Sequence, residues 1–196
     1  EHVTPKVDAS SHDRADICGR RQHGVAPHRS PANLHLLCAA RAGRSVLIVE
    51  VEGKSGLATS FGVAALEYEE AEVRPGVRAR TLTPDQALLE YLEDRGLKRI
   101  SKRLVRSGAL DVVATAVPGM KDILVLGKIK QMERAGLADL LILDAPAAGH
   151  AISFLQSASG LADAVPIGPI NAQAKDVLGL LGDPERCQVM LVTLPE

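Results

Sequence analysis

Two acidic residues stand at the ends of apolar segments, where they could hold a cation. Glu52 follows the run Ser45–Val51, and Asp144 ends the run Ala138–Asp144. In an open parallel sheet, ligands bind at the carboxyl ends of the strands. Carboxylates there suit Mg²⁺, which takes one or two of them and leaves its other positions to water and phosphate. The alternative for both residues is a solvated acid at a strand end.

A glycine-rich phosphate loop would complete a nucleotide–Mg²⁺ site, but the sequence does not contain the pattern G-x-x-x-x-G-K-[ST]. The tripeptide Gly53-Lys54-Ser55 has the last three residues of that pattern. It stands one residue after an apolar run and lacks the upstream glycine. We therefore interpret it as part of a polar loop over residues 52–60.

Apolar, β-branched runs predict three buried strands. They are Ser45–Val51, Ala138–Asp144 and Gln188–Leu194, and the alternating segment Val77–Leu82 predicts a further short strand. Helical stretches separate the runs, as in a parallel sheet that is covered on both faces. The expected fold class is therefore α/β, a doubly wound and mostly parallel sheet.

Five helices are predicted between and after these strands. Thr83 is the expected N-cap of the first helix, with Pro84 in its first turn and Gln86 at the capping-box position. The helices are expected at 84–95, 97–107, 121–135, 150–162 and 171–181, the last one capped by Asn171. Three helices between two strands are too many for a simple crossover, so we expect a helical insert at about 83–136.

The predicted helix 97–107 is strongly basic. Ile100 and Leu104 form its apolar side, and opposite them stand Lys98, Arg99, Lys102, Arg103 and Arg106. Such a helix can contact a membrane or a nucleic acid. We interpret it instead as the solvated face of an amphipathic helix, because the neighbouring acids Glu93 and Asp94 dilute its charge.

The first 38 residues differ from the rest of the chain. They contain five of the six histidines and two of the three cysteines, with no pair at convincing metal-ligand spacing. We expect this segment to be disordered; a metal-binding tail and a stretch translated out of frame are the alternatives. The expected organisation is an irregular segment at 1–38 and a partial folded domain at 39–196, with both ends cut as in a fragment.

Composition narrows the classes of function. The chain has 196 residues, of which 46% are hydrophobic, with 2 Phe, 2 Tyr and no Trp. The core must be aliphatic, and a base-stacking surface for single-stranded nucleic acid is not expected. The net charge of −1 gives no whole-chain attraction to nucleic acid or membranes. No apolar run approaches the roughly 20 residues that span a bilayer, and the cysteines form no CxxC motif, so a reducing, cytoplasmic location is expected.

From Ala39 onward the chain resembles the arsenical pump-driving ATPases, a family that also contains the ATPases that target tail-anchored membrane proteins. Segments 39–62, 118–129, 140–155 and 189–196 carry the resemblance. Its most specific feature is an aspartate and a histidine separated by five residues, the last of which is glycine, here Asp144 and His150. The resemblance implies the fold of a P-loop nucleotide triphosphatase, with ATP and Mg²⁺ as ligands.

The resemblance also implies roles for single residues. Asp144 would hold Mg²⁺ through water. Gly149 and His150 would belong to the loop that moves with the γ-phosphate. Glu52 would orient the attacking water, although the family has aspartate at this position and glutamate is one methylene longer.

Two further features bear on the activity. Pro118 and Gly119 match a Pro-Gly pair that opens a helix near the nucleotide in the family, whereas the family's phosphate loop has no counterpart at residues 19–27. The resemblance implies a cytoplasmic homodimer that couples MgATP hydrolysis to anion transport or protein targeting, with a membrane-protein or anion-transport partner and no nucleic acid. Because phosphoryl transfer depends on electrostatic stabilisation by such a loop, a non-catalytic binding module or a truncated fragment is the alternative.

Overall fold

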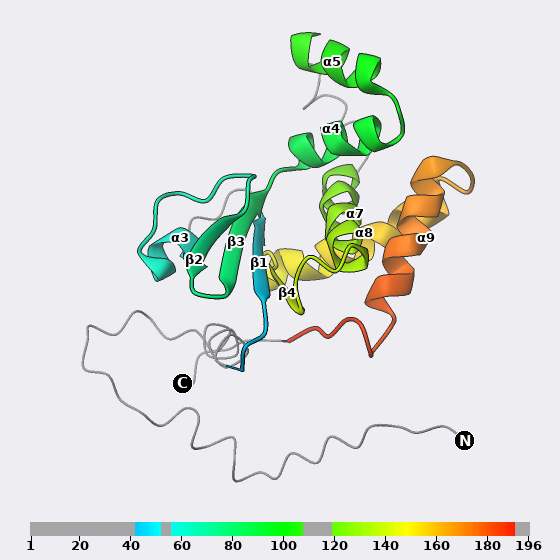
Figure 1. Ribbon diagram of the computed structural model, residues 1–196. Coiled ribbons are helices and arrows are strands. Elements are labelled where there is room, and N and C mark those ends of the chain that lie inside the picture. Colours follow the sequence, from blue (N-terminus) through cyan, green and yellow to red (C-terminus); the bar gives the residue numbers. More distant parts are fainter. Residues whose placement is uncertain (1–41, 52–55, 108–118, 191–196) are drawn as a thin grey trace, which may run out of the picture.

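The computed structural model describes residues 42–51, 56–107 and 119–190. The expectations for the segment 1–38, for residues 52–55 and for Pro118 lie outside the described residues. Figure 1 shows a sheet at the centre of the described part, with helices around it.

Four strands form one sheet in the order β2-β3-β1-β4. They are β1 (Val46–Val51), β2 (Ala71–Arg74), β3 (Val77–Leu82) and β4 (Leu140–Asp144). β1 pairs in parallel with both β3 and β4, and β2 pairs antiparallel with β3 at one edge. The expected α/β fold with a mostly parallel sheet is confirmed. β2 was not predicted, because Val73 is its one buried residue and so short a segment shows no strand pattern.

Six helices accompany the sheet in the described part of the chain. They are α3 (Gly56–Phe61), α4 (Pro84–Asp94), α5 (Lys98–Ser107), α7 (Met120–Arg134), α8 (Ala148–Ala164) and α9 (Pro169–Leu181). All except α3 match predicted helices. Thr83 caps α4 as predicted, since its Oγ1 accepts a hydrogen bond from the backbone N–H of Gln86 at 3.3 Å. None of these six helices is both long and apolar enough to cross a membrane.

A short helix replaces most of the loop that was expected over residues 52–60. α3 begins at Gly56, and its Leu57 side chain is buried. Leu57 packs with Val46 and Ile48 on one face of the sheet, and Phe61 lies against the same cluster. The apolar residues of this segment therefore cover a sheet face that a polar loop would leave exposed.

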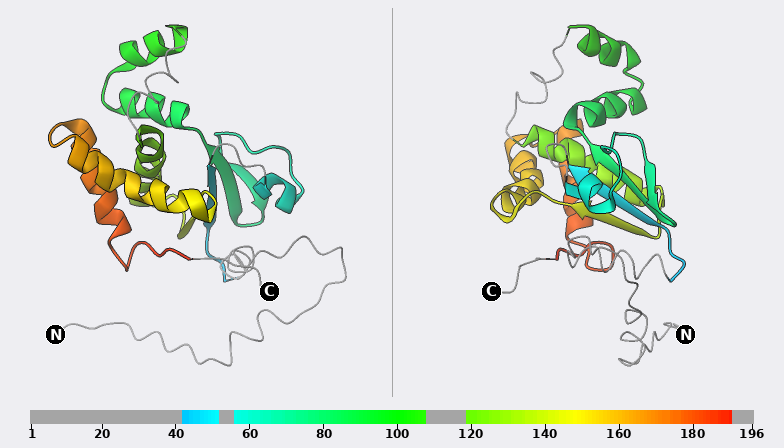
Figure 2. Two further views of the ribbon diagram at one scale, coloured as in Figure 1. Left: turned by 180° about the vertical axis from the view of Figure 1, so that it is seen from behind. Right: turned by 90° about the vertical axis from the view of Figure 1, so that its left-hand side faces the viewer.

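The opposite face of the sheet carries the main core. Leu47 and Val49 of β1 are completely buried there. They form one cluster with residues of α7, α8 and α9, among them Met132, Phe154 and Val177. Figures 1 and 2 show these three helices on one side of the sheet and α3 on the other. Both faces of β1 are thus covered, as its almost continuous apolar run predicts.

α4 and α5 lie beyond the carboxyl ends of the parallel strands (Figures 1 and 2). α4 follows β3 directly, and its Ala87 and Leu88 pack on Leu124 of α7. α7 itself belongs to the main core against the sheet. The helical insert at 83–136 stays a prediction, and within that range α4 and α5 are the helices that project from the sheet.

The predicted helix cap at Asn171 is wrong. α9 begins at Pro169, two residues earlier, and Asn171 is buried inside it. The Nδ2 of Asn171 donates a hydrogen bond to the carbonyl oxygen of Ala162 at 3.0 Å. Ala162 lies in the last turn of α8, where carbonyl groups lack helical partners. Asn171 therefore satisfies the end of the preceding helix instead of the start of its own.

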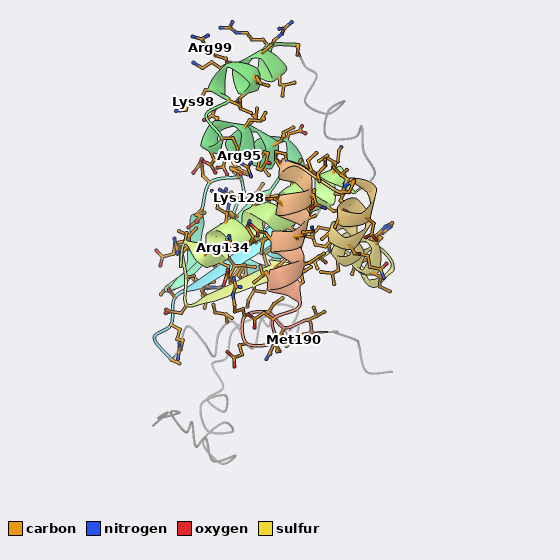
Figure 3. The ribbon with its side chains drawn as sticks, turned by 90° about the vertical axis from the view of Figure 1, so that its right-hand side faces the viewer. Arg95, Lys98, Arg99, Lys128, Arg134 and Met190 are labelled. Atoms are coloured by element: carbon orange, nitrogen blue, oxygen red, sulfur yellow. The ribbon has the colours of Figure 1, made fainter. Side chains whose placement is uncertain are left out.

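The predicted strand Gln188–Leu194 is not a strand as far as Met190. Residues 188–190 pair with no described strand. Val189 and Met190 are 72% and 59% exposed, and Met190 lies at the end of the molecule opposite α5 (Figure 3). A β-branched run needs a neighbouring strand to form a sheet, and the described part offers none here. Residues 191–194 lie outside the described residues.

Candidate functional site

The carboxyl ends of β1 and β4 bring two carboxylates to neighbouring positions. The strands are adjacent and parallel, and their register places Glu50 opposite Asp144. Ile48 and Ile142, two residues earlier, lie on the sheet face that α3 covers. Because side chains alternate along a strand, Glu50 and Asp144 belong to that same face. Neighbouring strands are about 4.8 Å apart, so both carboxylates share one small region at the carboxyl edge of the sheet.

Glu50 is a site residue that the sequence analysis did not single out. Its side chain is 1% exposed, and its Oε1 accepts a hydrogen bond from the backbone N–H of Leu57 at 3.2 Å. Glu50 therefore ties the end of β1 to the first turn of α3, on either side of residues 52–55. A glutamate inside an apolar strand was the available signal, because a carboxylate is rarely buried without a partner. We interpreted the run Ser45–Val51 only by its hydrophobicity and did not consider the glutamate inside it.

Asp144 ends β4, and α8 begins four residues later. The side chain of Asp144 is half-buried. Ala147 is the N-cap of α8, and its side chain makes no capping hydrogen bond. A helix N-terminus carries a partial positive charge and unpaired N–H groups, which suit a phosphate. Along the chain, a carboxylate that could bind a cation is thus followed by the start of a helix that could bind an anion.

Gly149 and His150 lie in the first turn of α8, and both are exposed. A Cβ added to Gly149 would meet no atom within 4 Å. The backbone of His150 is engaged, since its N–H donates to the carbonyl oxygen of Ala147 at 2.8 Å and its carbonyl accepts from the Oγ of Ser153 at 2.9 Å. Both residues therefore stand at the open start of α8, at the sheet edge where Asp144 lies.

Gly119 has a structural role that the sequence did not reveal. It is the N-cap of α7 and has a φ of +77°, in the left-handed region. A Cβ at this position would lie 3.2 Å from the Cβ of Ser157 and 3.6 Å from its Cα. α7 and α8 therefore approach so closely that only glycine fits without displacement. Burial also raises the pKa of Asp122, in the first turn of α7.

Two predicted site residues, Glu52 and Pro118, lie outside the described residues, and their roles stay predictions. Val51 ends β1 directly before Glu52. Gly119 follows Pro118 and opens α7, as the Pro-Gly match implied. The structure therefore describes a residue directly next to each of these two positions in the chain.

The carboxylates at this edge fit a magnesium ion bound together with a nucleotide. Among the described residues, no group of three or more His, Cys, Asp or Glu side chains could hold a metal ion alone. Mg²⁺ in nucleotide sites does not need such a cage, because it takes one or two carboxylates and completes its shell with water and phosphate oxygens. Asp144, with Glu50 beside it, meets this requirement.

A separate pocket of about 220 Å³ lies between α4, α7 and α9. Its wall includes the cations Arg95, Lys128, Lys130 and Arg134. Lys128 pairs with Glu90, and the Nζ of Lys130 lies 2.8 Å from Asp176 Oδ2 and holds the pKa of Asp176 below its ordinary value. Figure 3 shows Lys128 and Arg134 well apart from Lys98 and Arg99 of α5. These ion pairs join α7 to α4 and to α9.

Comparison with known proteins gives consistent matches. Residues 32–167 match the family model of the anion-transporting ATPases. The chain is 36% identical over 172 residues to the putative ATPase Mb3704 of Mycobacterium bovis and to the ATPase BagA of Mycobacterium tuberculosis. Each alignment covers 82% of this chain and 50% of the relative. The chain therefore spans about half the length of the curated relatives it matches.

Proposed function

The chain belongs to the anion-transporting ATPase family, and on this premise we propose that it contributes to an ATP-hydrolysing site at the carboxyl edge of its sheet. The reaction is the attack of water on the γ-phosphate of ATP, in line with the leaving ADP. In such a site Mg²⁺ neutralises charge on the phosphates. The chain's own residues bind, orient and respond to the nucleotide.

Each predicted site residue has a distinct task in this proposal. Asp144 holds the metal through water, and Glu52 orients the attacking water as a hydrogen-bond acceptor. The exposed first turn of α8, with Gly149 and His150, faces the γ-phosphate and responds to its loss. Gly119 supports the site by letting α7 and α8 approach closely.

The observation that carries the proposal is the strand register that places Glu50 opposite Asp144, four residues before α8 begins. A buried glutamate that binds the N–H of Leu57 holds β1 and α3 together. Glu52 lies between these two elements in the sequence, and we propose that its side chain lies near Asp144. The position of Asp144 at the carboxyl end of β4, next to β1, supports one shared site for the acid that holds the metal and the acid that orients the water.

The finer part of the proposal concerns coupling. We propose that hydrolysis moves α4 and α5, which lie beyond the same sheet edge, in a cytoplasmic homodimer that serves anion transport or protein targeting. The family's description and the order of elements support this. The relatives' printed names say only that they are ATPases.

Ligand-dependent thermal unfolding tests the proposal on the 196-residue chain. MgATP at 100 times its Kd should add about 2.7 kcal/mol to the free energy of unfolding, and EDTA should abolish the effect. Asp144→Asn should weaken MgATP binding at least tenfold and abolish phosphate release. Asp163→Asn is the matched control, because Asp163 is an exposed aspartate at the far end of α8. Equal binding and hydrolysis in both variants would refute the role of Asp144.

A non-catalytic binding module is the second candidate function. The sequence favours it at one point, because the pattern of the phosphate loop does not occur in the chain. This candidate predicts no stabilisation by MgATP or MgADP in the unmodified chain. That result would exclude ATP hydrolysis by this chain and assign its function to binding.

A further inference from the structure

α5 concentrates positive charge on one side. Five of its ten residues are basic and none is acidic: Lys98, Arg99, Lys102, Arg103 and Arg106. At 3.6 residues per turn, these five positions fall within an arc of about 140°. The chain as a whole has a net charge of −1, so this charge is a local property of one helix. We call these five side chains the basic face.

The contacts of α5 turn its basic face outward. Ser101, on the opposite side of the helix, is buried, and its Oγ donates a hydrogen bond to Glu93 Oε1 of α4 at 3.2 Å. α4 is the element that α5 mainly contacts within the described part of the chain. In Figures 1 and 2, α5 is the outermost helix beyond the sheet edge. Figure 3 shows Lys98 and Arg99 at this outer end of the molecule.

The charges of the basic face are not neutralised by the described residues. The ion pairs of the described part involve Arg78, Arg80, Lys128, Lys130, Arg134 and Arg186. No member of the basic face forms one. A solvated helix face normally mixes both signs of charge, so five unpaired cations in three turns indicate an anionic partner.

Exposed apolar residues flank the basic face. Ile100 is 48% exposed and Val105 is 55% exposed, and Leu97, just before the helix, is also exposed. By their positions on the helix, Ile100 and Val105 lie at the two boundaries between the basic face and the buried seam with α4. A partner that covers the basic face would therefore also meet apolar side chains.

We propose that α5 binds the surface of an anionic phospholipid membrane, with the basic face on the headgroups and Ile100 and Val105 at the sides of the contact. Clusters of about four to eight Lys or Arg residues on a helix are typical of segments that bind anionic lipid headgroups. Phosphate backbones of a nucleic acid would also attract the cations but would gain nothing from Ile100 and Val105. A flat surface can contact a helix about 15 Å long along its whole length. The proposed binding does not depend on ATP hydrolysis.

Vesicle sedimentation tests the proposal with the full 196-residue chain. The vesicles contain phosphatidylcholine alone or with 30% phosphatidylglycerol, and the chain should bind only the anionic ones. Each basic residue near such a surface contributes about a fivefold increase in binding. Lys98→Gln, Lys102→Gln and Arg106→Gln together should therefore lower binding about 100-fold. Raising NaCl from 150 to 500 mM should weaken wild-type binding, because salt screens these charges.

A matched triple variant controls for net charge. Arg44→Gln, Arg74→Gln and Lys175→Gln remove three exposed cations far from α5 in sequence, and binding should stay within about threefold of wild type. Ile100→Ser with Val105→Ser should weaken binding while its salt dependence remains. Unchanged circular dichroism and thermal unfolding would show that each variant is folded.

Three results would overturn the proposal. The first is equal binding of the chain to neutral and anionic vesicles, or no binding to either. The second is an equal loss of binding in the α5 triple variant and its control. The third is salt-dependent binding to duplex DNA in place of vesicles, which would assign the basic face to nucleic acid.

Discussion

Replacing Gly119 by alanine should destabilise the fold by two separate effects. The φ of +77° at this position places an L-residue in the left-handed region, which costs roughly 1–2 kcal/mol. The new Cβ would also lie 3.2 Å from the Cβ of Ser157, and overpacking of this kind costs roughly another 1 kcal/mol. The expected loss in the free energy of unfolding is therefore about 2–3 kcal/mol.

Gly96→Ala separates the two effects. Gly96 has a φ of +75°, close to that of Gly119, but a Cβ there would meet nothing within 4 Å. It should therefore lose only the conformational part, roughly 1–2 kcal/mol. Urea denaturation gives both free energies, and thermal unfolding should show a fall in Tm of about 2–4 °C per kcal/mol.

A double variant tests the contact itself. Ser157→Gly removes the Cβ that the new methyl group would approach most closely, so the combination with Gly119→Ala should recover part of the loss. The reasoning is refuted if Gly119→Ala is no more destabilising than Gly96→Ala, or if Ser157→Gly brings no recovery. Stability changes that appear only with MgATP present would instead assign Gly119 to the ligand.

Two further predictions concern buried and paired carboxylates. Glu50→Ala should lower the free energy of unfolding by about 2 kcal/mol, because the N–H of Leu57 loses a buried acceptor. Glu72→Ala is the control, because it removes an exposed carboxylate that accepts a hydrogen bond from a backbone N–H, and it should cost clearly less in urea denaturation. Equal costs of the two variants would contradict the role of Glu50. The hydrogen bond from Lys130 lowers the pKa of Asp176 from its ordinary 3.8, so the pair stabilises the fold at pH values above 3.8 and this contribution disappears as the pH falls through the lowered pKa. As the pH is lowered from about 5 to 2, the Tm should therefore fall more steeply in the wild type than in Asp176→Asn. Parallel curves of Tm against pH would count against a stabilising role of the pair.

Much of the fold could be predicted because local patterns coincide with the tertiary structure. The run Ser45–Val51 is apolar at almost every position, and β1 is covered on both faces. Thr83 and Gln86 form the predicted start of α4, because a cap depends on residues only three positions apart. Where burial depends on distant partners, prediction failed. Asn171 serves the end of α8 rather than its own helix, and residues 188–190 find no strand to pair with.

The sequence by itself determined the kind of fold, most of the helices and the acids at the ends of two strands, because these follow from periodicity and from residue type. Only the tertiary structure decided which acids meet. The register of β1 and β4 places Glu50 opposite Asp144, and no local signal sets the register between residues 94 positions apart. The close approach at Gly119 and the outward direction of the basic face of α5 were likewise decided by packing between helices. Contacts of this kind depend on the shape of both partners, and a single stretch of sequence describes only one of them.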